Sequence, residues 1–246
     1  MSDTFAIEYA LTLPDGKQEC FHVDLDAESL VLIRQPPEAP PVWTELGFHQ
    51  CANCPLREDL HPLCPVAVSV FDVVKLAAQL PSYEEVSVRV TVPERTVVTT
   101  TTAQRALASL MGLLFATSGC PHTTIFRPMA RFHLPFASEQ ETMFRAMGSW
   151  LLAQYMARAE GRPASLDLDG LIQAYEEMQV INRHITRRLW AAVKLDASVN
   201  AVVLLDLLGK AMPDTIEEQL HELRYLFAAW LDGRGFTPAP RDPDDD

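Results

Sequence analysis

Four of the five cysteines have a spacing that could form one metal site. Two residues separate Cys51 from Cys54, which lets both thiolates face one ion from a tight loop. Cys64 begins a predicted helix, whose positive dipole end favours a thiolate, and Cys120 follows another predicted helix. We predict that Cys51, Cys54, Cys64 and Cys120 bind a metal, and we expect Cys20 to be a small buried side chain.

The residues that follow these cysteines bear on the identity of the metal. Proline follows Cys54, Cys64 and Cys120, as it follows a cluster ligand in bacterial ferredoxins. Single, widely spaced ligands also suit a [4Fe-4S] cluster. Structural zinc held by four cysteines fits the same set, so cluster and zinc stay open near parity, with the cluster slightly favoured. Buried thiols or a metal-free thiol switch are the remaining alternative.

Three histidines flank the cysteines and could replace one of them as a ligand. They are His49, His61 and His122. We expect each of them instead to hydrogen-bond to a ligand or to lie exposed in a loop.

A second group of residues, Arg127, Arg131 and His133, lies in a segment bounded by prolines soon after Cys120. Two arginines and a histidine at this spacing could bind an anion. The favoured alternative is a connector whose arginines pair with the carboxylates of this acidic chain.

No residue pattern identifies a reaction, so whether the protein is an enzyme stays open. Glu218 and His221 have the spacing of half a di-iron site, but no second copy exists. We expect this pair to be at the surface and Arg183 to Arg188 to form the solvated face of a helix. The sequence has no glycine-rich phosphate loop and no nucleophile elbow.

Composition limits the classes of partner. The 246 residues include 33 acidic and 20 basic side chains, a formal net charge of −13, which disfavours nucleic acid. Apolar stretches are too short to cross a bilayer, and no secretory signal begins the sequence. We therefore expect a cytoplasmic protein without a membrane partner, in which an odd number of cysteines in a reducing compartment argues against disulfides.

Hydrophobic periodicity predicts an α+β fold with a small antiparallel sheet and two helices in the N-terminal half. Alternating apolar residues predict a hairpin around Pro14 to Gly16, a third strand at 29–34, and strands at 86–92 and 95–100. Helical patterns cover 65–80 and 103–117, and Gly119 is placed to end the second helix.

The C-terminal half is predicted to be all-helical, with about four helices. A capping box at Ser138 and Glu141 opens the first, which extends to about Glu160. The others are expected at 171–189, 198–210 and 214–231. We predict an α+β metal-binding region at 1–125, a helical region at 126–236 that could meet a protein partner, and a disordered acidic tail at 237–246.

The sequence resembles an uncharacterised bacterial family classed as a domain of unknown function. The resemblance rests on segments 43–44, 48–56, 61–65, 118–121, 127–137 and 151–155, which include all four predicted ligands. It implies no activity, ligand or catalytic residue. Our leading hypothesis is therefore a structural or regulatory protein that binds an iron–sulfur cluster or zinc. The alternative is a redox enzyme or sensor whose cluster is reactive and whose Arg127, Arg131 and His133 bind an anion.

Overall fold

The N-terminal half is built on a four-stranded antiparallel sheet. The computed structural model describes residues 4–77, 79–192 and 220–233. The strand order is β2-β1-β3-β4, with bounds β1 Thr4–Thr12, β2 Gln18–Asp26, β3 Glu85–Val92 and β4 Arg95–Thr102. Both predicted hairpins are present, and the central pairing of β1 with β3 joins them. The predicted α+β class is confirmed.

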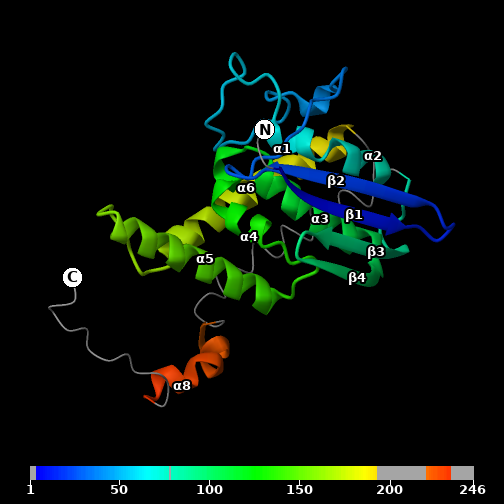
Figure 1. Ribbon diagram of the computed structural model, residues 1–246. Coiled ribbons are helices and arrows are strands. Elements are labelled where there is room, and N and C mark those ends of the chain that lie inside the picture. The colour runs from blue at the N-terminus through cyan, green and yellow to red at the C-terminus, as the bar shows by residue number, and fades with distance from the viewer. Residues whose placement is uncertain (1–3, 78, 193–219, 234–246) are drawn as a thin grey trace.

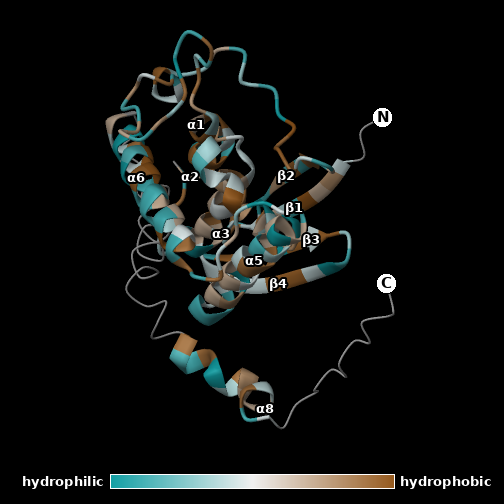
Figure 2. Cartoon of the chain, turned by 90° about the vertical axis from the view of Figure 1, so that its left-hand side faces the viewer, coloured by the Kyte–Doolittle hydropathy of each residue, from teal (hydrophilic) through white to brown (hydrophobic). Residues whose placement is uncertain are grey.

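One face of the sheet is covered by helices. Phe5, Ile7, Tyr9 and Leu11 of β1 alternate with more exposed residues and are buried, as are Val86, Val88 and Val90 of β3. Helix α3 Ala103–Thr117 packs on this face, and α1 Pro65–Ser69 and α2 Phe71–Ala77 pack against α3. Figures 1 and 2 show them on one side of the strands. The opposite face carries Glu8, Ser87 and Arg89, so the architecture is two-layered.

The described part of the C-terminal half is mostly helical. The long helices are α5 Glu139–Ala159 and α6 Asp169–Ala192. Shorter elements are η1 Val42–Thr44, η2 Pro121–Phe126, α4 Arg127–Arg131, η3 Arg224–Phe227 and α8 Ala228–Leu231. A C-terminal half that is mostly helical was also predicted from sequence.

The helix predicted at 65–80 is instead two short helices that meet at Val70. The Ser69 hydroxyl donates to the Val66 carbonyl at 2.8 Å, which offers the backbone an alternative to the helical bond. A run of β-branched valines further lowers helix propensity here.

Other predicted elements differ from the structure or lie beyond it. The third strand expected at 29–34 is reduced to one bridge between Leu25 and Leu32. The predicted helix at 198–210 and the acidic tail lie outside the described residues, and of the helix predicted at 214–231 only 220–231 is described.

Cys20 is exposed, so its predicted burial is wrong. Alternation along β2 turns Val23 and Leu25 toward the helices. Cys20 is therefore on the opposite face of the strand.

Residues of both predicted regions share the main hydrophobic core. Ile181, Ile185 and Leu189 of α6 belong to the same buried cluster as the sheet and α3. A second, smaller cluster lies between α5 and α6 and includes Met143 and Tyr175. The domain boundary at residue 125 stays a prediction. What the packing shows is that α6 is part of the surroundings of the cysteines.

The capping box that starts α5 gives a test of local stability. The Ser138 hydroxyl accepts from the Glu141 backbone N–H at 3.2 Å, and the Glu141 carboxylate accepts from the Ser138 N–H at 2.7 Å. Ser138→Ala removes one of these bonds and should lower the free energy of unfolding by about 1 kcal/mol, measured by urea denaturation. Ser149→Ala inside the same helix is the control. Because alanine is the better helix former, this control should be neutral or slightly stabilising, and equal losses in both variants would contradict the prediction.

Candidate metal centre

The four predicted ligands line one small cavity in the N-terminal half. Cys51, Cys54, Cys64 and Cys120 surround a space of about 20 Å³, roughly enough for a single water molecule. The rest of the wall is mainly apolar and includes Leu46, Leu56, Val66, Ile181 and Ile185. Side chains up to 69 positions apart in the sequence thus meet at one place. Their convergence is a property of the fold, whereas their binding of a metal stays a prediction.

Two of the cysteines cap helical turns. Cys64 precedes α1 and Cys120 precedes η2, and each is followed by a proline in the first turn. The backbone N–H groups of Val66 and Ala67 lower the pKa of Cys64, and those of His122 and Thr123 lower the pKa of Cys120. These N–H dipoles favour the thiolate form of both cysteines.

Burial has the opposite effect on the pKa values of the thiols. It raises the pKa of Cys51 to about 12 and that of Cys120 to about 11, and it raises the pKa of Cys64 as well. The neighbouring cysteines raise these pKa values further, because several thiolates would repel one another. Without an added positive charge, these three thiols therefore stay protonated at neutral pH.

Helix α6 holds the loop that carries Cys51 and Cys54. Between these cysteines, the Asn53 amide donates to the Glu177 carboxylate of α6. His122 Nε2 lies 2.7 Å from the Asn53 carbonyl oxygen, and His184 Nδ1 lies 3.2 Å from that of His49. The loop is thus bound to α6 on both sides of Cys51.

The three flanking histidines have different positions. His122 lines the cavity with the cysteines, whereas His49 has a positive φ of 49° and packs its ring edge-on against Phe48. His61 is exposed. Only His122 is therefore near enough to act on the cavity directly.

A buried arginine lies beside the cysteines. Arg188 is 1% exposed, and its positive charge lowers the pKa of Cys51 and of Cys64. Its guanidinium donates to the carbonyls of Trp43, Glu45 and Leu46 at 2.5–3.0 Å, while Nε is buried without a hydrogen-bond partner. Among the described residues it has no ion-pair partner.

The expected solvated face of Arg183 to Arg188 is therefore wrong at Arg188. Helical geometry places Arg188 one turn after Ile185 and two turns after Ile181, on the buried side of α6. The sequence signal was available in this spacing: the arginine lies seven positions after the first of the two buried isoleucines. Arginine side chains are seldom fully buried, so the sequence-based prediction placed Arg188 at the surface.

The segment held by Arg188 also positions Cys64. The Cys64 N–H donates to the Thr44 carbonyl at 2.8 Å, and the Leu46 N–H donates to the Pro62 carbonyl at 2.9 Å. Residues 43–46 form a strap that pairs with residues 62–64. Arg188 binds three carbonyls of this strap.

The side chains are not preformed around a single ion. Among the described residues, no group of three or more His, Cys, Asp or Glu has an arrangement that could hold one metal ion. Ligation by the four cysteines would require a change of their rotamers, or a cluster in which each thiolate binds a different iron.

The segment predicted to bind an anion does not form one site. Arg131 forms an ion pair with Glu94 at 3.3 Å and lies over the ring of Phe5, while Arg127 donates to the Ser29 carbonyl at 3.2 Å. His133 is buried, and its Nε2 lies 2.5 Å from the Tyr9 hydroxyl. Pairing of Arg131 with a carboxylate corresponds to the favoured alternative, a structural connector.

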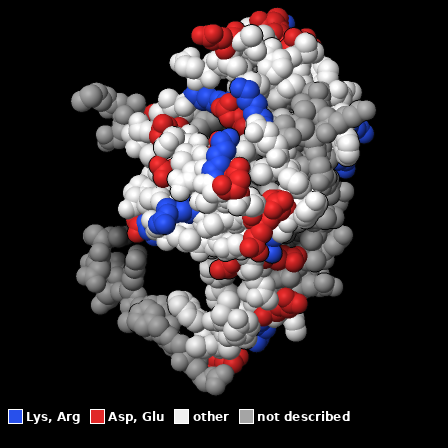
Figure 3. Space-filling model, turned by 90° about the vertical axis from the view of Figure 1, so that its right-hand side faces the viewer, with Lys and Arg blue, Asp and Glu red and all other residues white. Residues whose placement is uncertain are grey.

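The described surface of one face of the molecule carries charges of both signs. On the face in Figure 3, the coloured side chains mix Lys and Arg with Asp and Glu, and the described part of this face has no continuous basic area. No described helix is long and apolar enough to span a membrane.

The buried histidine predicts a pH dependence of stability. Burial and the nearby charge of Arg145 lower the pKa of His133 from 6.5 to about 3. Between these values the unfolded chain binds a proton that the native state does not. The free energy of unfolding should therefore fall as the pH falls, by up to about 3 kcal/mol between pH ~6.5 and ~4.

Denaturant titrations across this pH range would measure the effect. His133→Leu should flatten the pH dependence, whereas His61→Ala, at an exposed histidine, should keep the slope of the unmodified protein. An unchanged slope in His133→Leu would show that another group is responsible.

Comparison with known proteins identifies the family. The searches of curated proteins and of solved structures gave no significant match. The family model described as Domain of unknown function (DUF6901) matches residues 7–228, which include all four cysteines, the Arg188 helix and most of the sheet. This match confirms the resemblance noted in the sequence, and the chain belongs to the DUF6901 family.

Proposed function

We propose that this protein binds an iron–sulfur cluster through Cys51, Cys54, Cys64 and Cys120, in a structural or regulatory role. The observation that carries the proposal is the buried Arg188 beside four converging cysteines. Zinc at the same residues is the second candidate.

The charge balance of the site supports the binding of a metal by thiolates. An arginine buried without an anion is costly, because carbonyl dipoles replace only part of its hydration. Four protonated thiols would give Arg188 no negative charge. Four thiolates around a cluster or a zinc ion carry a net negative charge, which would both balance the guanidinium and remove the need to protonate the sulfurs.

The surroundings of the sulfurs favour a cluster over zinc. Backbone N–H groups at two helical turns lie near enough to Cys64 and Cys120 to lower their pKa values, and N–H groups near the sulfurs help to set the potential of a cluster. A zinc ion needs all its sulfurs about 2.3 Å from one point. The described side chains do not have an arrangement of this kind. A cluster would spread its thiolates over separate irons, and the cavity of about 20 Å³ would have to widen to hold it.

A redox enzyme or sensor would use the same cluster. Such a function would need an anion site near it, and the groups we predicted for this, Arg127 and Arg131, bind elsewhere in the fold. The structural or regulatory role is therefore the better supported.

Location and partners belong to the same proposal. We propose a cytoplasmic location, where thiols stay reduced. We also propose that a protein partner binds the helical region. The exposed apolar side chains of α5 support this: Leu151, Leu152, Tyr155 and Met156.

Metal analysis of protein purified without oxygen tests the site. We expect about four iron and four acid-labile sulfide per chain, with a broad absorption band near about 400 nm. Serine in place of any one of the four cysteines should lower the iron content. Cys20→Ser, at an exposed cysteine outside the site, is the matched control and should not change it. Stoichiometric zinc without colour would select the second candidate, and folded protein with neither metal would refute metal binding.

Arg188 gives a second, independent test. Arg188→Leu should speed the loss of the bound metal to a chelator by about 10- to 100-fold, the range typical of residues that support metal ligands. Arg187→Leu is the control, since Arg187 is the exposed neighbour on the same helix. Circular dichroism would check folding of both variants. Equal rates of metal loss in the two would contradict the role assigned to Arg188.

A further inference from the structure

A second and much larger cavity lies along an adjacent face of α6. Its volume is about 480 Å³, within the range of small-molecule sites. Tyr175, Met178 and Asn182 of α6 line it, whereas Ile181 and Ile185 of the same helix line the cysteine cavity. The two cavities are therefore separate, and binding of a molecule in the larger one does not require a metal at the cysteines.

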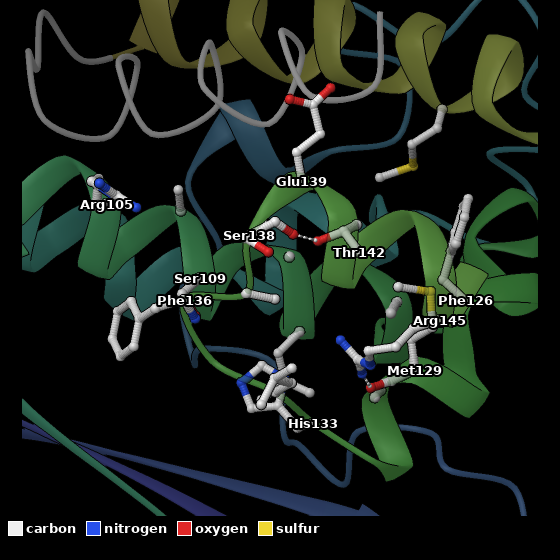
Figure 4. Close-up of a pocket in the computed structure, with 18 of the residues that line it drawn as sticks. Arg105, Ser109, Phe126, Met129, His133, Phe136, Ser138, Glu139, Thr142 and Arg145 are labelled. Carbon is white, nitrogen blue, oxygen red and sulfur yellow. Dashed lines mark hydrogen bonds between the residues drawn. The ribbon is translucent and has the colours of Figure 1, made fainter. Parts of the chain in front are cut away.

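The walls of this cavity are mainly apolar. Helix α3 contributes Ala108, Gly112 and Ala116, which recur at every fourth residue and so lie on one face of the helix. Their small size leaves the space open. Phe126 and Met129 form part of the opposite wall, and Figure 4 shows both on the same side of the cavity as Arg145.

Arg145 supplies a positive charge to the cavity. It extends from α5 and donates through Nη2 to the carbonyls of Met129 and Phe132, at 2.6 and 2.8 Å. Among the described residues it has no ion-pair partner. The carboxylate of Glu141, one turn earlier on α5, accepts from the Ser138 N–H, and its charge acts on Arg145 without a direct ion pair.

The other charged and titratable groups leave this positive charge available. Burial keeps His133 uncharged at neutral pH, because its pKa falls to about 3. In Figure 4 the Glu139 carboxylate points away from Arg145, and Arg105 lies at the far end of the view. Arg145 is thus the cation that faces the middle of the cavity.

A buried amide in the wall lacks a partner. Asn182 is 1% exposed and lines the cavity, and its Oδ1 atom is buried without a hydrogen bond to the described residues. An unsatisfied buried acceptor of this kind costs about 1–3 kcal/mol. A donor on a bound molecule would remove that cost.

We infer that this cavity binds a largely apolar organic acid, such as a fatty acid, whose carboxylate pairs with Arg145. The apolar wall of α3 would contact the body of the molecule. A planar guanidinium matches a carboxylate better than other charged groups do. Asn182 would accept a hydrogen bond from ligands that carry a donor.

Fluorescence titration of the full-length protein with a dansylated long-chain fatty acid tests the inference. This probe has an apolar body, a carboxylate and an N–H donor. We expect saturable binding, competition by the unlabelled fatty acid, and weaker binding of the probe's methyl ester by about tenfold or more, because the ester lacks the charge. Folded protein that binds no probe, or that binds acid and ester equally, would overturn the inference.

Substitutions in the cavity wall test where the probe binds. Ala108→Leu fills the cavity and should weaken probe binding by about tenfold or more, whereas Ala153→Leu makes the same change on the exposed face of α5 and should have no effect. Arg145→Gln should abolish the preference for acid over ester, and Arg145→Lys should keep part of it. Circular dichroism and metal content would confirm that each variant is folded. Binding unchanged in Ala108→Leu would place the probe elsewhere and refute the site.

Discussion

The buried guanidinium of Arg188 is the interaction on which the rest of the structure depends. It joins α6 to the strap at residues 43–46, and the strap pairs with the chain that enters Cys64. Removing a charge from water is costly, so a fold that buries Arg188 needs either many oriented carbonyls or an anion nearby. Three carbonyls are present, and the four cysteines could supply the anion as thiolates.

Helix α6 lines two cavities whose walls differ in composition. Its Ile181 and Ile185 face the cysteines, while Tyr175 and Asn182 face the large cavity. Between the same two regions, η2 carries His122 at one end and Phe126 at the other. A change in the position of α6 would therefore alter both cavities, because a packed helix moves as a unit. This arrangement gives a physical route by which a bound ligand and a bound metal could affect each other.

Much of the fold could be predicted from periodicity and caps. Alternation in β1 and β3, the capping box at Ser138 and the end of α3 before Gly119 all depend on neighbouring residues, and the structure has them. The predictions that were wrong concern burial, which depends on tertiary packing. Exposure of Cys20 follows from which face of β2 meets the helices, and burial of Arg188 follows from the packing of α6.

The sequence by itself determined the candidate ligands, because the Cys-x-x-Cys pair and the two Cys-Pro turns are local patterns. It also determined the α+β order of elements. Only the tertiary structure decided that these cysteines share one cavity near the charge of Arg188, and that Arg145 rather than Arg127 or Arg131 lines the large cavity. The physical reason is that spacing along a chain sets which side chains share a face of an element. Which faces then meet, and which charges are left without partners, depends on the packing of elements far apart in sequence.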